Sequence, residues 1–108
     1  MAAKFTNANA ILTTSRVKAY TAPVGIQSVV HGLFVSNVDT TNKLVHYVTI
    51  EYKDAGGTYN IIAKDIPVPY GNALIVDKTI NLNATEELYL TADASSSLQA
   101  FFSILEKS

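Results

Sequence analysis

The side chains best suited to acid–base or metal chemistry are two histidines, His31 and His46. A catalytic or metal-binding histidine needs a convergent partner, such as a carboxylate that orients the ring or a second ligand at short spacing. The two histidines are separated by fifteen positions and belong to no spaced motif. His31 stands mid-segment beside Gly32, and His46 falls on the apolar phase of an alternating segment. We therefore predict structural histidines, bonded to backbone or solvent.

Other reactive residue types also lack the arrangement that chemistry requires. Glu86 and Glu87 are adjacent, so on a strand they face opposite ways and cannot share a proton or a sugar. The serines at 95–97 have no accompanying base or nucleophile-elbow glycines, which predicts a loop. Gly56-Gly57 is followed by no lysine and helix start, which predicts a hairpin tip rather than a phosphate cradle. Four acidic residues lie in separate segments and match no calcium-loop spacing: Asp39, Asp54, Asp77 and Asp93.

The sequence thus predicts no catalytic, cofactor-binding or metal-binding residue, and leaves open only a site that several loops assemble. The chain has no cysteine, which excludes a disulfide framework, a thiolate nucleophile, a zinc knuckle and an iron–sulfur site. Tryptophan is absent, and Arg16 is the only arginine. Binding of a carbohydrate on aromatic side chains is a minor alternative, and binding of nucleic acid is less expected still. The stacking faces available are six tyrosines: Tyr20, Tyr47, Tyr52, Tyr59, Tyr70 and Tyr89.

Charge and hydropathy indicate a partner of another kind. The chain has 8 basic and 9 acidic residues and a net charge of −1, which argues against nucleic acid and against an anionic membrane surface. No apolar run approaches the ~20 residues that span a bilayer, and the first residues lack a signal peptide's apolar stretch, so synthesis in the cytosol is expected. Only 16% of the 108 residues are charged and 48% are hydrophobic. One small core does not cover that much apolar surface, so a second subunit or a larger assembly is expected to cover the rest.

The elements that would position these residues are strands. Valine, isoleucine and threonine are abundant, and from residue 10 onward short apolar segments alternate with turn residues about every 8–12 positions. Residues 1–9 are small and polar apart from Phe5, which predicts a flexible arm that orders against a neighbour. Strands are expected at 11–20 and 26–36. In the second, both phases are apolar, so either Gly32 marks a bulge or both faces are covered.

The clearest predicted element is a hairpin. From Leu44 to Tyr52 alternate residues are mainly apolar, and residues 54–57 are of types that favour a turn. On the return strand, Tyr59, Ile61 and Ala63 are expected to point inward. Residues 66–72 contain two prolines, which exclude a central strand and predict an extended crossing between the sheets. Further strands are expected at 73–78, 79–82, 88–92 and 98–105, the last in preference to a terminal helix. The prediction is one all-β domain at 10–108, an antiparallel β-sandwich of about 7–8 strands with jelly-roll or immunoglobulin-like Greek-key topology.

Five stretches carry a resemblance to a known family: YTAPVG at 20–25, LFVSN at 33–37, IPVP at 66–69, INLN at 80–83 and EELYLTA at 86–92. In them the chain resembles the small β-sandwich virion proteins of tailed bacteriophages, which include head decoration (cement) proteins and tail or neck accessories. The resemblance covers residues 17–105 and rests on the general pattern of the segments rather than on a diagnostic motif. Members often place Gly-Asp before the penultimate strand, where this chain has Glu86-Glu87, so the subgroup stays open. The family brings no catalytic or ligand residues.

The resemblance implies a non-enzymatic structural protein located in the virion. A decoration protein typically sits as a trimer over junctions between capsid subunits and resists the pressure of packaged DNA. The partners it implies are the major capsid protein or other virion proteins, together with further copies of the chain, a trimer being favoured. The expected contact segments are the arm at 1–9 and the loops at 37–42 and 67–72. The alternatives are a tail, neck or baseplate accessory protein and a receptor- or glycan-binding module; an enzyme would need titrating groups clustered in one pocket.

Overall fold

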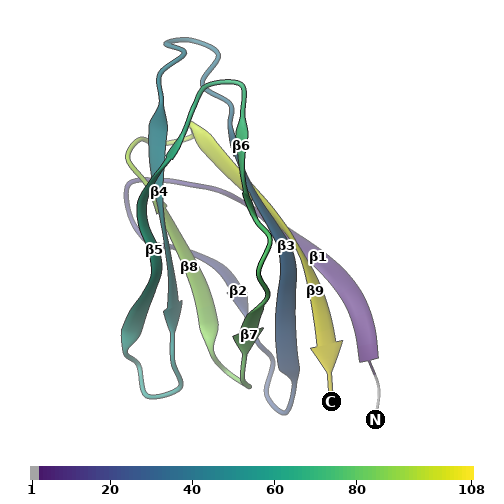
Figure 1. Ribbon diagram of the computed structural model, residues 1–108. Coiled ribbons are helices and arrows are strands. Elements are labelled where there is room, and N and C mark those ends of the chain that lie inside the picture. Colours follow the sequence, from purple (N-terminus) through teal and green to yellow (C-terminus); the bar gives the residue numbers. More distant parts are fainter. Residues whose placement is uncertain (1–2) are drawn as a thin grey trace.

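The computed structural model describes residues 3–108, which form nine strands in two antiparallel sheets packed face to face (Figure 1). The strands are β1 (Ala3–Ile11), β2 (Val17–Thr21), β3 (Gln27–Asn37), β4 (His46–Lys53), β5 (Tyr59–Val68), β6 (Ala73–Val76), β7 (Ile80–Leu82), β8 (Glu87–Ala92) and β9 (Leu98–Lys107). The all-β sandwich predicted from the sequence is confirmed.

The strand order is that of a jelly roll. One sheet has the order β1-β9-β3-β6, with β7 also paired to β3, and the other has the order β2-β8-β4-β5. The pairs are nested along the chain, first strand with last and second with second-last, as when one long antiparallel ribbon folds over on itself. This nesting decides between the two topologies that the sequence left open. Because β6 and β7 lie along the same side of β3 on either side of a break at 77–79, they act as one interrupted edge strand.

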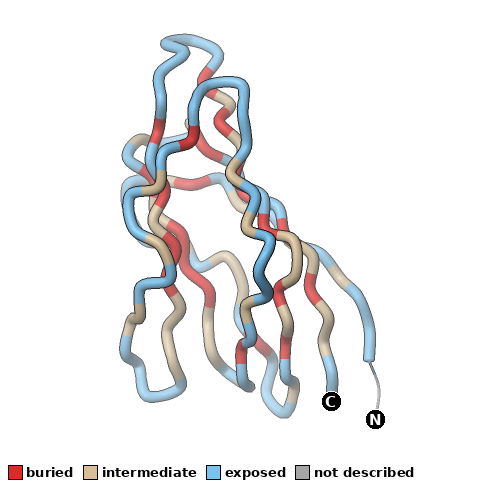
Figure 2. Tube along the Cα trace, in the orientation of Figure 1, coloured by how far each residue is buried: buried red, intermediate tan, exposed pale blue. Residues whose placement is uncertain are grey.

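Alternation of buried and exposed side chains along the strands places the core between the sheets (Figure 2). β9 shows it most clearly: every second residue from Leu98 to Ile104 is buried, whereas Gln99 and Phe101 are exposed. The C-terminal segment is therefore a strand, as predicted, with its apolar residues arranged at a period of two rather than along a helical stripe.

β3 changes face half-way along its length. Its even-numbered residues are buried up to Val30 and its odd-numbered residues from Leu33 onward. The pairing with β9 shifts between these two residues, where Gly32 has a φ of +98°. Glycine adopts that conformation without strain, and the inserted residue is a β-bulge. Of the two explanations for the apolar phases of 26–36, the bulge is correct.

β4 and β5 form the predicted hairpin, with its tip at Asp54. The Asp54 carboxylate accepts 3.0 Å hydrogen bonds from the backbone N–H groups of Gly56 and Thr58, and the Gly57 N–H donates to the Asp54 carbonyl at 3.0 Å. Gly56-Gly57 is thus a hairpin tip, as predicted. On β4 the inward phase runs from His46 to Tyr52 as expected.

The facing predicted for the return strand is wrong at two positions. Tyr59 and Ile61 pair with β4 residues of the outer face and therefore point outward. Ala63 packs against the core, as predicted. Between Ile61 and Ala63 the pairing with β4 shifts, and the extra residue is Ile62. A strict period of two fails across this bulge, and the sequence contains no glycine there to mark it.

The N-terminal boundaries also differ from the prediction. Residues 3–9, expected in a flexible arm, are the greater part of β1, which pairs with β9 from Ala3 to Ile11; residues 1–2 of that arm lie outside the described residues. The single strand expected at 11–20 is wrong, because β1 ends at Ile11 and β2 begins only at Val17. The chain passes from one sheet to the other between them, and Leu12 fills the core at this corner.

Of the two prolines in 66–69, one lies in an edge strand and the other in the segment that follows it, which are positions where proline is tolerated. Pro67 is in β5, which is an edge strand of its sheet. The chain then leaves at Val68 and crosses to the other sheet, where β6 begins at Ala73. The crossing predicted at 66–72 is therefore found at 69–72, whereas residues 66–68 belong to the edge strand β5.

Candidate assembly surface

The outer face of the five-stranded sheet carries a row of large apolar side chains, which we call the apolar row: Ile75, Phe34 and Phe101. Ile75 on β6 is the register partner of Phe34 on β3, which is in turn the partner of Phe101 on β9. Their exposed fractions are 62%, 41% and 43%. The two phenylalanine rings lie 6.5 Å apart at a tilt of 45°. Register partners on one face lie close enough to form a continuous surface, so these residues make one patch across three strands.

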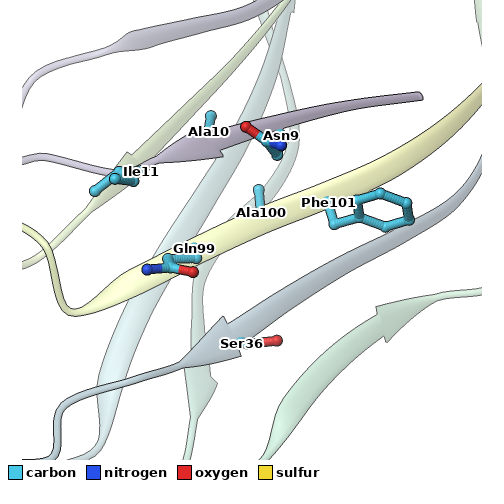
Figure 3. Close-up of a pocket in the computed structure, with 7 residues that line it drawn as sticks. All are labelled: Asn9, Ala10, Ile11, Ser36, Gln99, Ala100 and Phe101. Atoms are coloured by element: carbon cyan, nitrogen blue, oxygen red, sulfur yellow. The ribbon is translucent and has the colours of Figure 1, made fainter. Parts of the chain in front are cut away.

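A shallow hollow of about 400 Å³ adjoins the apolar row at Phe101 (Figure 3). It runs over β1, β9 and β3 and is lined on its outer side by Asn9, Ile11, Ser36 and Gln99. Figure 3 shows Phe101 and the Ser36 hydroxyl projecting from neighbouring strands. The hollow thus combines two amide side chains and a hydroxyl with an aromatic ring, a mixture that suits polar surfaces of a partner.

The outer face of the four-stranded sheet is different, because many of its large side chains are bonded to one another, although Ile61 and Tyr47 are exposed there. The Arg16 guanidinium donates two hydrogen bonds to the Glu51 carboxylate, at 3.0 and 3.2 Å, and lies 3.8 Å from the centre of the Tyr59 ring. Tyr59 packs edge-on against Tyr89 at 5.2 Å. The Glu51 hydrogen bond raises the pKa of Arg16. Guanidinium, carboxylate and rings satisfy one another here.

The same network continues to β2. The Tyr89 hydroxyl donates a 2.9 Å hydrogen bond to Glu87, whose carboxylate also lies 3.2 Å from the Lys18 ammonium. Burial, followed by the bond to Glu87, raises the pKa of the Tyr89 phenol. The hydrogen bond from Tyr89 lowers the pKa of Glu87, and Lys18 lowers it further. This face has little unsatisfied chemistry to offer a ligand.

The strongest cluster of titratable groups is at the end of the sandwich where β4 begins. The His46 ring is 6% exposed and lies between two carboxylates. Its Nε2 is 2.8 Å from Asp39 Oδ2, and its Nδ1 is 2.9 Å from Asp93 Oδ1. The hydrogen bond to Asp39, followed by that to Asp93, raises the pKa of His46. The His46 bond in turn lowers the pKa of Asp39 to about 2.

The prediction that His46 bonds only to backbone or solvent is wrong. Asp39 precedes β4 in one loop and Asp93 follows β8 in another, so the jelly-roll topology brings together three residues that the sequence keeps apart. With a carboxylate on each ring nitrogen, the imidazolium is the favoured state and neither nitrogen has a lone pair free to act as a base or a ligand. The alternation that places His46 inward, beside a polar loop, was the only signal in the sequence.

Asn37 extends this cluster into a network of loops. Its side-chain amide donates 2.8 Å hydrogen bonds to the carbonyls of Leu44 and Val68, and its carbonyl oxygen accepts one from the Asp39 N–H at 3.0 Å. The loop at 37–42, expected as a contact segment, is therefore tied to the end of the sandwich from within. The chemistry of the cluster is structural, since each buried polar group has a partner inside the chain.

The remaining candidate residues lie apart from one another. His31 stands beside the β3 bulge, where Phe5 packs edge-on against its ring at 5.8 Å, and its Nε2 is buried with no hydrogen-bond partner. Glu86 accepts a hydrogen bond from the Asn83 N–H in the turn before β8, while Glu87 bonds to Tyr89. Asp77 lies in the break between β6 and β7, and the serines at 95–97 lie between β8 and β9.

The tyrosines do not form a common stacking surface. Tyr59 and Tyr89 are in the network with Arg16, and Tyr52 packs against the core. Tyr20 donates its hydroxyl to Glu106, and burial raises its pKa to about 12. Tyr47 and Tyr70 are exposed, on β4 and in the crossing at 69–72. A glycan site built on several tyrosines thus has no counterpart in this arrangement.

Within residues 3–108, no three His, Asp or Glu side chains are grouped so that they could hold a metal ion. No helix in this part of the chain has the length and apolar character needed to cross a membrane.

Comparison with known proteins shows a shared fold. No protein-family model matches the sequence, and no curated protein matches it. A chain from Bacillus endospore appendages, described as disulfide-linked pili, superposes with a TM-score of 0.60 at 12% identity, over 99% of this chain and 87% of that one. A chain from the acidic stable capsid structure of Helicobacter pylori bacteriophage KHP30 gives a TM-score of 0.55 at 8% identity, over 98% of this chain and 87% of that one. The chain therefore has a β-sandwich fold that also occurs in a pilus and in a phage capsid.

Proposed function

We propose that this protein is a non-enzymatic structural protein of a bacteriophage virion, and more narrowly a capsid decoration (cement) protein that stabilises the head by binding at capsomer junctions. The observation that carries the proposal is the apolar row. Three large side chains adjacent in register on an outer face contribute little to the stability of an isolated subunit, and contiguous apolar patches of this kind are typical of interaction sites.

Further support comes from the contrast between the two outer faces. On the four-stranded sheet, charged and aromatic side chains satisfy one another, and the exposed Ile61 has the charged Glu51 as its register partner. On the five-stranded sheet the exposed Ile75, Phe34 and Phe101 are register partners of one another. The family resemblance and the fold shared with a phage capsid chain agree with a virion role. The shared fold with disulfide-linked pili does not extend to their linkage, since this chain has no cysteine.

The physical mechanism is stabilisation by mass action. A ligand that binds the closed shell and not the opened one raises the free energy of opening, and the gain grows with occupancy. Each contact through the apolar row need only be weak, because several copies fixed on one shell act together. We propose that the protein acts as a homo-oligomer, for which the family resemblance favours a trimer.

The test compares two isoleucines of matched exposure. Ile75 on the proposed contact face is 62% exposed, and Ile61 on the other outer face is 59% exposed; both are on edge strands. We expect Ile75→Lys to lower the affinity for purified capsids of the same phage by at least ~10-fold, because an ammonium would have to be desolvated in the contact. Ile61→Lys is expected to leave that affinity unchanged. Co-sedimentation with capsids measures both.

The same preparations report on the mechanism. Wild-type protein is expected to raise the temperature at which the capsids open, and Ile75→Lys to lose most of that increase. Wild-type protein that fails to bind capsids would overturn the decoration function. Binding to purified tails or baseplates instead would support the accessory role, in which the same face is used.

One observation favours a second function, the binding of a glycan receptor. The hollow beside Phe101 presents the amide side chains of Asn9 and Gln99 next to an aromatic ring, and amides with a stacking ring are common partners of sugar hydroxyls. Glycan-array binding that disappears in Gln99→Ala and persists in Ile61→Lys would support this function. An array with no signal would exclude it for the glycans present.

A further inference from the structure

The four sheet edges are not equally protected against pairing with another chain. The edges are β1 and β6 with β7 in one sheet, and β2 and β5 in the other. β2 is five residues long and its pairing shifts between Lys18 and Tyr20. β6 and β7 are interrupted at 77–79. β5 contains Pro67 and register shifts. Shortness, bulges and proline are the features by which edge strands avoid intermolecular pairing.

β1 has none of these features. It is nine residues long, contains no proline and pairs with β9 one-to-one without a shift. Its one protective feature is Lys4, its only charged residue, whose ammonium lies 3.7 Å from the Glu106 carboxylate of β9. Phe5 is 75% exposed. Because β1 is the edge of its sheet and its register has no shift, the backbone N–H and C=O groups on its side away from β9 form a regular row, which is a template for an added strand.

We propose that the free edge of β1 binds the same edge of a second copy of this chain, with the two β1 strands antiparallel about a two-fold axis at Asn7. Within the described residues β1 is the least protected edge, so a second copy offers its own β1 as the equivalent partner. Antiparallel self-pairing is two-fold symmetric and closes after two copies. The two five-stranded sheets then form one continuous sheet. This interface does not depend on the decoration function.

A register centred on Asn7 uses the whole strand and avoids a clash of charge. It places Ala3 of one copy opposite Ile11 of the other, and so pairs the full length of β1. Lys4 of each copy faces Ala10 of the other, so the two ammonium groups are not directly opposite one another. Like charges in directly opposed positions destabilise a strand pair, and this register contains none.

The register also covers the most exposed aromatic residue of the sheet. Phe5 of one copy lies opposite Asn9 of the other on the outer face, and Asn9 is the register partner of Phe101. Phe5 therefore extends the apolar row of the neighbouring copy across the axis. Each dimer would present two such rows on one face, which strengthens any contact that the face makes with a larger partner.

The test is a charge exchange at the axis. Asn7 is exposed and on the outer face, so substitution leaves the core untouched, and thermal unfolding of each variant checks this. Sedimentation equilibrium up to ~1 mM protein is expected to show a dimer for the wild type. Asn7→Lys and Asn7→Asp are each expected to weaken self-association by at least ~10-fold, because like charges meet at the axis. An equimolar mixture of the two variants is expected to restore the dimer.

Gln99→Lys is the matched control, because it places the same charge on the same face but on β9 and away from the axis; it is expected to leave the dimer unchanged. A wild-type monomer at all concentrations, or a dimer that both Asn7 variants retain, would overturn the proposal. A trimer insensitive to Asn7 substitution would also overturn it while leaving the decoration function standing. If the Asn7→Lys variant is a monomer that still binds capsids, the dimer interface is supported and the decoration function is shown not to depend on it.

Discussion

At the scale of single residues, His46 is a titratable group that has a structural role rather than a catalytic one. Both ring nitrogens face carboxylates, one from the loop before β4 and one from the segment after β8. The ring therefore links two loops across one end of the sandwich. Removal of the ring would leave two acidic groups near each other with no cation between them, which is a repulsive arrangement.

The pKa shifts in this cluster predict how stability depends on pH. The pKa of His46 is raised above its ordinary 6.5, chiefly by Asp39, so its contribution is complete below pH 6.5 and is lost as the pH rises through the raised value. The pKa of Asp39 is lowered from 3.8 to about 2, so its contribution is complete above pH 3.8 and is lost as the pH falls toward 2. We expect the cluster to stabilise the protein most between these limits, in mildly acidic solution.

Thermal unfolding as a function of pH measures this effect. His46→Gln is expected to lower the unfolding temperature most in the acidic window and to remove the decline in stability on the alkaline side. His31→Gln is the matched control, because His31 has no carboxylate partner among its described contacts, and it is expected to keep the decline. Identical pH profiles for the wild type and His46→Gln would contradict the prediction.

At the scale of elements, neighbouring residues on β9 differ in burial. Phe102 is fully buried between the sheets, whereas Phe101 is 43% exposed on the outer face. We expect Phe102→Ala to cost about 3–5 kcal/mol of unfolding free energy, as other buried phenylalanines do, and Phe101→Ala to cost less than about 1 kcal/mol. Urea unfolding measures both, and Phe102→Leu provides a milder variant if the alanine variant fails to fold. Equal losses at the two positions would contradict the strand assignment.

The bulge in β3 gives a second test at this scale. A Cβ at Gly32 would have open space around it, so Gly32→Ala would strain only the backbone, at a φ of +98°. We expect a loss of about 1–3 kcal/mol, the usual cost of such a conformation. Gly56 has no positive φ, and a Cβ there would lie 3.3 Å from Asp54 Oδ1, which requires only a small shift of that side chain. Gly56→Ala is therefore expected to cost less, and urea unfolding compares the two. A neutral Gly32→Ala would mean that β3 can pair without the bulge.

Sequence periodicity predicted these elements where the strands are regular and failed where they are not. The inward phases of β4 and β9 follow a period of two and were predicted correctly. At Gly32 the glycine itself signalled a break. At Ile62 no residue type marks the bulge, so the facing of Tyr59 and Ile61 was predicted wrongly. β1 was missed because Ala, Asn and Thr form a strand here only through pairing with β9, a partner at the other end of the chain.

The site residues show the same limit. The apolar row could not be predicted from its own strands, because it depends on which of β3, β6 and β9 are neighbours and in what register. Asp39 and Asp93 lie far apart in the sequence and match no motif, and it is the topology that brings both to His46. Short-range pattern indicates which face a residue occupies, whereas nested long-range pairing decides its neighbours.

At the scale of the whole molecule, the first and last strands pair with and stabilise each other. β1 pairs with β9 over its full length, and Ala8 and Ala10 pack against the core. We therefore expect deletion of residues 1–9 to lower the unfolding temperature markedly, because it unpairs one side of β9 and uncovers part of the core. Near-UV circular dichroism and thermal unfolding measure this. A truncated protein of wild-type stability would show instead that these residues act as a detachable arm.

The pairing of β1 with β9 also fixes where attached sequences would leave the molecule. Ala3 and Lys107 are register partners, so the start of β1 and the end of β9 lie side by side, at the end of the sandwich opposite the loop at 38–45 (Figure 1). A short glycine-rich bridge would therefore join them, and reopening the backbone at the 54–57 hairpin tip would give a circular permutant with every ladder intact. For the same reason, a protein fused at either end would project from the same end of the sandwich and leave the end that contains His46 unobstructed.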